Sequence, residues 1–349
     1  MENVCEAVER VLSLYSEDKL FQASRELAKI ENDLGHLSED SEERLFLKNH
    51  VGLRPVRDEA NKVTLMMNTM RSDEGWSPCY QGPSTKVSFR KEPNSAILTF
   101  KIEGLVVAKV GHVACIINEI DLFPDIFWFI REGKTLKKIG RMKRVLHVRS
   151  KILWPILDRD FLSHAAAIDG LDQDDCIAIL TIEDLADQPA SALARYGITE
   201  EDLMNCSNSV RAEMEVNFVF TPVEPTITKV ICVARADPKL PFVPVQLINW
   251  IGRAFGRLML KAIEAKANNL SVTHRKRYEG DPLYRWIEER IGQYWAARGR
   301  KEEFDQGVVD LNRRESIENN VDTAPKGPGR AIMMSLAGRK VPWGSKAEL

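Results

Sequence analysis

The stretch Trp154-Pro155-Ile156-Leu157-Asp158-Arg159-Asp160-Phe161 lies between two segments that have the composition of β-strands. It places an aromatic side chain, a proline and a tight pair of opposite charges in one short segment. Ile152 and Leu153 make its N-terminal side apolar as well, although connecting segments run over the surface and are mostly polar. We therefore expect this segment to have a role beyond joining two strands.

Apolar and polar residues alternate around this stretch, and alternation with period two predicts half-buried antiparallel strands. The clearest example is 210 to 220, where Val210, Ala212, Met214, Val216, Phe218 and Phe220 face one way. Other predicted strands cover 85–91, 95–103 and 226–236, and a further meander runs through 135–151, 161–168 and 175–183. The middle of the chain is thus a meander of antiparallel strands.

Helical spacing of apolar residues predicts a helical hairpin over residues 1–40. A second helical stretch begins near Ser41 and is expected to be interrupted at Pro55. After the strands, 243–268 carries Leu247, Ile251, Phe255, Leu258 and Ala262 on one face, which predicts a long amphipathic helix.

Two segments follow this helix. Residues 269–300 are predicted to contain one further amphipathic helix, and 301–349 is polar enough to be a disordered tail. Between the strands at 175–183 and 210–220, Thr199 and Asp202 have the spacing that caps a short helix.

Composition excludes several classes of protein. The formal net charge of −2 argues against a dedicated nucleic-acid binder, which needs a basic surplus to neutralise phosphates. The six cysteines are far apart, and no Cys or His pairing suggests a metal site. No signal peptide and no long apolar segment is recognisable, so we expect a cytoplasmic protein without a cofactor.

The Trp154 to Phe161 stretch resembles the Trp-Pro-x-x-x-Arg-Asp-Phe signature of the START (steroidogenic acute regulatory protein-related lipid transfer) family. Further signposts follow in the family's order: Val210-Arg211-Ala212, then Asp237-Pro238-Lys239-Leu240-Pro241, then the helix at 243–268. The resemblance covers about 42 to 268 and implies an α+β helix-grip fold, a curved antiparallel β-sheet wrapped around a long C-terminal helix. A START-like domain at 41–268 is the expectation.

The resemblance implies a lipid in a cavity between sheet and helix. The expected lining consists of Arg159, Met214, Val216, Phe218, Phe220, Leu247, Ile251 and Phe255. Segments 150 to 160 and 238 to 252 match the family's lids, and their apolar residues are expected either to contact a membrane or simply to cap the core: Trp154, Ile156, Leu157, Phe242, Val243 and Trp250.

Arg159 is the most informative single residue, because the matching arginine of START proteins points into the cavity. A buried guanidinium needs a partner, and residues 133 to 151 contain no acid. Either the ligand supplies the partner, or one of these carboxylates does: Asp158, Asp160, Glu213, Glu215 or Asp237. A ligand partner favours a phosphate-bearing lipid over a sterol.

The basic run at 131–151 is interpreted either as a surface attracted to anionic lipid or as an ordinary solvated strand face. His147 and His164 have no Ser, Cys or Asp arrangement typical of a hydrolytic triad, so no catalytic residue is predicted. The expected function is to bind a phospholipid or sterol and to transfer or sense it in transient contact with a membrane. The alternatives are a hydrolase or cyclase on the same fold, or a protein-interaction scaffold with a structural lipid.

Overall fold

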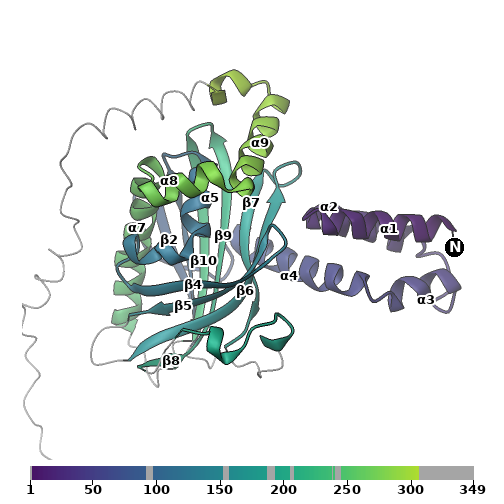
Figure 1. The fold of residues 1–349 in the computed structure, drawn as a ribbon, viewed down its shortest axis with the longest axis horizontal. Coiled ribbons are helices and arrows are strands. Elements are labelled where there is room, and N and C mark those ends of the chain that lie inside the picture. Colours follow the sequence, from purple (N-terminus) through teal and green to yellow (C-terminus); the bar gives the residue numbers. More distant parts are fainter. Residues whose placement is uncertain are drawn as a thin grey trace, which may run out of the picture. The chain divides into compact units, whose positions relative to one another are not determined.

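The protein is built around one antiparallel sheet in the strand order β1-β2-β3-β10-β9-β7-β6-β5-β4 (Figure 1). The computed structural model describes residues 2–305 except 92–96, 152–156, 187–192, 205–207, 238 and 240–244, and of residues 2, 91, 98, 245–255 and 257 only the backbone. The strands are β1 (Ser77–Gln81), β2 (Thr85–Lys91), β3 (Leu98–Val106), β4 (Ile130–Ile139), β5 (Lys143–Ser150), β6 (Asp158–Gly170), β7 (Cys176–Asp184), β8 (Ser209–Arg211), β9 (Glu213–Glu224) and β10 (Ile227–Asp237).

Helices cover both faces of this sheet. The described helices are α1 (Glu2–Ser16), α2 (Leu20–Asp33), α3 (Glu42–Asn49), α4 (Leu53–Arg71), α5 (Val110–Asn118), α7 (Val245–Asn268), α8 (Val272–Gly280) and α9 (Pro282–Ala297), with short 3-10 helices η1 (Ile120–Asp125) and η2 (Glu200–Asp202). We call the face that packs against α5 and α7 the inner face, and the opposite one the outer face.

The inner face is apolar because every second residue of its strands is apolar. Val87, Ile102 and Phe220 of the sheet share one buried cluster with Cys115 of α5 and Ile263 of α7. The helix α7 lies over β1, β2 and β3, whereas α5 lies over β9 and β10. The long C-terminal helix thus packs on the inner face of the antiparallel sheet, as the helix-grip arrangement requires.

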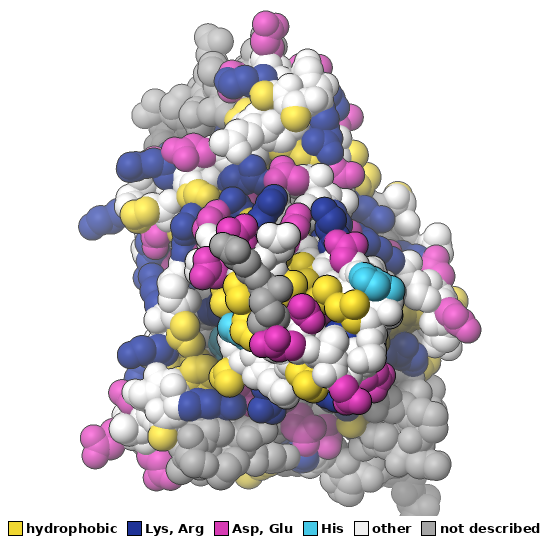
Figure 2. All heavy atoms as spheres, turned by 90° about the vertical axis from the view of Figure 1, so that its right-hand side faces the viewer, with side chains coloured by type: hydrophobic (Ala, Val, Ile, Leu, Met, Phe, Trp, Pro, Cys, Tyr) yellow, Lys and Arg dark blue, Asp and Glu magenta, His cyan; other side chains and the backbone are white. Residues whose placement is uncertain are grey.

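On the outer face, the N-terminal helices bury their apolar stripes against the sheet. Leu27 of α2 and Val63 of α4 share a buried cluster with Leu180 of β7 and Val219 of β9. Figure 2 looks at these helices and shows Lys and Arg side chains interspersed with Asp and Glu around a group of hydrophobic ones. The predicted N-terminal hairpin therefore shares a hydrophobic core with the sheet.

The N-terminal helical break differs from the prediction. The chain leaves helix at His50–Gly52, and Pro55 lies in the first turn of α4 rather than at the interruption. Proline is tolerated there because the first backbone N–H groups of a helix have no intrahelical acceptor, so nothing is lost by removing one.

The predicted single strand at 210 to 220 is also two elements. β8 pairs in parallel with the start of β6, and β9 begins only at Glu213, with the Ala212 N–H donating to the Asp160 carbonyl at 3.0 Å. Because β6 already begins at Asp158, the predicted lid loop at 150 to 160 is shorter than expected.

Residues 269–300 form two helices rather than one. The Ser271 hydroxyl accepts from the His274 N–H and starts α8, and Asp281 accepts from the Leu283 N–H at 2.9 Å and starts α9 with Pro282 at its first turn. A second N-cap followed by proline restarts the helix in a new direction. The short helix predicted from Thr199 and Asp202 is confirmed, with both capping hydrogen bonds formed.

Candidate functional site

Arg159 and Asp160, adjacent in the signature, lie on opposite faces of β6. Val148 of β5 is opposite Phe161 in the register and packs against the inner core, so alternation also places Arg159 on the inner face. The Arg159 residue is only 3% exposed, and its guanidinium Nη1 donates to the carbonyl oxygens of Leu157 and Asp158. Burial lowers the pKa of Arg159 from its ordinary value, but a guanidinium remains charged.

Asp160 faces outward into a buried polar cluster. Its carboxylate accepts from Nε2 of His147 at 3.1 Å, from the Ser209 hydroxyl at 3.0 Å and from Nε of Arg211. Nδ1 of His147 accepts from the Met204 N–H at 3.2 Å, which leaves the proton on Nε2. Burial raises the pKa of Asp160, but the hydrogen bonds from His147 and Arg211 outweigh it and lower the pKa to about 2.

This cluster explains why two separated sequence signposts occur together. Arg211 of the Val210-Arg211-Ala212 stretch is opposite Asp160 in the parallel pairing of β8 with β6, and the two side chains form an ion pair. The outward residue of the signature, Asp160, thus joins two distant parts of the chain. The inward residue, Arg159, faces the inner side of the sheet.

Other carboxylates that the sequence offered for Arg159 have basic partners elsewhere. Asp158 pairs with Arg131 at 2.5 Å, and Glu213 pairs with Lys239. Asp237 also lies near the Lys239 ammonium, at 3.4 Å.

The predicted lining from β9 lies together on the inner face. Phe218 and Phe220 are buried and stacked, with ring centroids 5.8 Å apart, while Val216 and Met214 are half-buried. Leu247, Ile251, Phe255 and Trp250 belong to α7, but their side chains lie outside the described residues, as do Trp154, Ile156, Phe242 and Val243 altogether. Leu157 is described, and it is 54% exposed.

The C-terminal half of α7 packs tightly on β2 and β3. A Cβ atom added to Gly256 would be 2.5 Å from Cγ2 of Val87 and 3.3 Å from Cγ1 of Ile102. On the opposing strand, a Cβ at Gly104 would be 2.6 Å from Leu260. Glycine on both sides therefore allows a close helix–sheet approach at this end of the domain.

Towards β4, the inner face is less completely covered. Several apolar side chains contact the inner core but remain only half-buried, and they come from four neighbouring strands: Val148, Ala167, Ile179 and Val216. Apolar residues on the inward side of a sheet are normally fully buried, so their partial exposure indicates space above this part of the sheet.

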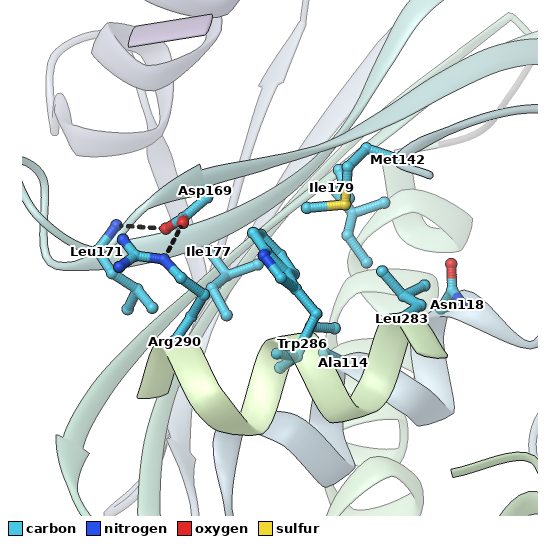
Figure 3. Close-up of a pocket in the computed structure, with 12 residues that line it drawn as sticks. Ala114, Asn118, Met142, Asp169, Leu171, Ile177, Ile179, Leu283, Trp286 and Arg290 are labelled. Carbon is cyan, nitrogen blue, oxygen red and sulfur yellow. Dashed lines mark hydrogen bonds and ion pairs between the residues drawn. The ribbon is translucent and has the colours of Figure 1, made fainter. Parts of the chain in front are cut away.

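One end of this space is closed by α9 (Figure 3). Trp286 points from α9 toward the sheet beside Ile177 and Ile179, and Arg290 donates to Asp169 at 2.6 Å. The cavity left here measures about 20 Å³, enough for one water molecule. Helix α9 thus forms an end wall.

The basic run at 131–151 is largely engaged in ion pairs. Lys143 pairs with Glu59 at 2.7 Å and Arg149 with Glu132 at 2.9 Å, both on the outer face. Arg144 lies between these two on the same strand and is only 7% exposed, although in the sequence it looks like any other member of the basic run. Alternation could have predicted that Arg144 points inward, because Leu146 and Val148 are the apolar residues that follow it at every second position.

Comparisons with known proteins give structural similarity only. No protein-family model and no curated protein matches the sequence. Human STARD10 is 12% identical with a TM-score of 0.49, over 66% of this chain and 87% of that one. Human StAR-related lipid transfer protein 5 is 15% identical with a TM-score of 0.44, over 64% and 97%. The Zhui aromatase/cyclase from Streptomyces sp. R1128 is 10% identical with a TM-score of 0.33, over 53% and 98%.

At such identities a likeness concerns the fold, and function has to be argued from the site. The fold itself follows from the topology of this chain. An antiparallel sheet in the order β1-β2-β3-β10-β9-β7-β6-β5-β4 carries α5 and the long helix α7 on its inner face, and the Arg-Asp-Phe stretch begins β6. The sheet and these two helices thus have a START-like helix-grip fold.

Proposed function

We propose that this protein binds a single lipid between the inner face of the sheet and α7, and exchanges it at a membrane surface. The observation that carries the proposal is the set of half-buried apolar side chains on the inner face: Val148, Ala167, Ile179 and Val216. Leaving apolar groups beside open space is unfavourable in water, by about 25 cal/mol for each Å². A lipid chain in this space removes that cost.

The lining proposed for this site is the set of residues predicted from the sequence. Arg159 supplies the one inward charge of the signature, and Met214, Val216, Phe218 and Phe220 supply the apolar wall of β9. The α7 residues Leu247, Ile251 and Phe255 stay part of the proposed set, although their side chains lie outside the described residues. Such a site accepts an amphiphile whose chain fills the apolar space.

Membrane contact is proposed for the end of the domain at which β6 begins. Leu157 is 54% exposed and Trp128 is 49% exposed. The Lys151 N–H donates to the Phe129 carbonyl at 2.6 Å, which holds the segment after Trp128 against the strand end that leads to Leu157. Exposed apolar side chains beside the cations Arg131 and Lys151 suit an interface of anionic lipid. Within the described residues, no helix is long and apolar enough to cross a bilayer.

The test of lipid binding is native mass spectrometry of the purified full chain, followed by solvent extraction and identification of bound molecules. We expect a one-to-one complex with a lipid that survives gel filtration. A chain that emerges without lipid, and that binds none from mixed vesicles, would contradict the proposal.

A further inference from the structure

A second buried arginine, Arg144, faces the same side of the sheet as Arg159. Its neighbours fix the direction: Lys143 points outward to Glu59 at 2.7 Å, and Val145 belongs to an outer cluster with Leu162. Met142, two residues before Arg144, packs into the inner core. Alternation along β5 therefore turns Arg144 inward, where the residue is 7% exposed.

Within the described part of the chain, the Arg144 guanidinium has no hydrogen bond, ion pair or ring contact. The inward carboxylate of β6, Asp169, is already paired with Arg290 at 2.6 Å. A buried charge without a partner is strongly unfavourable. An anion bound next to Arg144 would compensate this charge.

Small side chains surround Arg144 on the inner face. Ala165 is directly opposite it in the register, and Ser163 and Ala167 follow on either side along β6. Short side chains there leave room above the sheet for a ligand group. The half-buried Ser163 hydroxyl makes no hydrogen bond to any described residue, which adds a second free polar group to the same spot.

We propose that Arg144, assisted by Ser163, binds the acidic headgroup of the bound lipid, a carboxylate or a phosphate. The inference rests on the lipid-binding function proposed above and names the ligand class. A guanidinium offers parallel N–H donors that match two oxygens of either anion, and the apolar surroundings strengthen such a contact. Arg144 is opposite Ala165, which lies six positions after Arg159 on β6. Along the strand, the two arginine positions are therefore about 20 Å apart. The headgroup thus lies at the α9 end, and the chain runs toward the start of β6.

The test compares ligands that differ only in their charge, bound to the delipidated full chain and measured by calorimetry. One pair is palmitic acid and hexadecanol, and the other is lysophosphatidic acid and monoacylglycerol. We expect the natural protein to prefer at least one acidic member over its neutral counterpart. In Arg144→Leu that acid should bind roughly 10- to 100-fold more weakly, as expected for loss of a charge-assisted hydrogen bond, while the neutral member binds unchanged.

The matched control is Arg149→Leu, which removes the same charge from the outward side of the same strand and should keep the preference. In the absence of lipid, Arg144→Leu should melt at a higher temperature than the natural protein, because it removes an uncompensated buried charge. A lower melting temperature would show that Arg144 has a structural partner and would overturn the proposal.

The remaining outcomes separate this inference from the proposed function. If neutral and acidic members bind equally well, the proposal that Arg144 binds an acidic headgroup is wrong, but the proposal of lipid binding is still supported. Stabilisation by inorganic phosphate, with no binding of the acidic amphiphiles, would identify a free anion as the ligand and overturn the lipid headgroup. If no member of either pair binds, and no lipid copurifies, both proposals fail.

Discussion

At the scale of single residues, the adjacent Arg159 and Asp160 of β6 lie on opposite faces of the sheet. Asp160 is 2% exposed and holds Arg211 and His147 on the outer face, so it ties β8 to β6. Its pKa is lowered from 3.8 to about 2 in the folded chain, so the stabilisation of about 2 kcal/mol is fully present above pH 4 and is lost as the pH falls through about 2.

We predict that Asp160→Asn lowers the free energy of unfolding at pH 7 by about 3–5 kcal/mol, because Arg211 and His147 lose their buried counter-charge. Chemical denaturation at pH 7 and at pH 2–4 should show that the variant lacks part of the acid sensitivity of the natural protein. Glu132→Gln, which removes a carboxylate that is 47% exposed, serves as the control and should change little. Equal acid sensitivity in Asp160→Asn and the natural chain would contradict the role given to this cluster.

At the scale of elements, the glycine of α7 is tightly packed against the sheet, whereas the glycine of α9 has space around it. Gly256 of α7 is a contact point, because an added Cβ meets Val87 at 2.5 Å. Gly292 of α9 has only an atom of Phe304 at 3.8 Å in its way, an ordinary contact. Alanine favours a helix over glycine by about 0.5–1 kcal/mol, so the sign of a substitution reports the packing.

Gly256→Ala should therefore destabilise the protein by about 1–3 kcal/mol through overpacking, whereas Gly292→Ala should stabilise it by about 0.5–1 kcal/mol. Urea denaturation of both variants measures the difference. Should Gly256→Ala prove as stabilising as Gly292→Ala, the close approach of α7 to β2 and β3 is absent in solution.

At the scale of the whole molecule, the N-terminal helices cover the outer face and α9 closes one end of the inner face. We therefore place the proposed lipid exchange at the end at which β6 begins. We predict that Trp128→Ala slows lipid transfer between vesicles severalfold without lowering the melting temperature, because the indole is 49% exposed and contributes to membrane insertion rather than to the core. A fluorescent-lipid transfer assay gives the rate.

Val51→Ser is the control for this prediction, since Val51 is 84% exposed in the turn between α3 and α4 and its replacement should leave the transfer rate unchanged. Loss of transfer in Trp128→Ala that merely follows a loss of stability would place this tryptophan in the core and contradict a membrane role.

The sequence by itself determined the local features of this protein. Alternation predicted β2, β7 and β10 closely, helical spacing predicted α7, and the Thr199–Asp202 cap appeared where its residues required it. These features depend on neighbours a few positions apart, so local pattern suffices. The resemblance carried by Trp154 to Phe161 supplied the fold and the expectation that Arg159 points inward, and the register of β5 with β6 places Arg159 on the inner face.

Only the tertiary structure decided which charges are paired. Asp160 meets Arg211 from a segment about fifty positions away, and Lys143 meets Glu59 of the outer helices, while Arg144 between such pairs keeps no described partner. In the sequence Lys143 and Arg144 belong to one basic run, whereas Arg211 and the acids Glu59 and Asp160 are scattered along the chain. Pairing depends on which strands become neighbours and on which face each side chain emerges, and both are set by sheet topology and burial rather than by spacing along the chain.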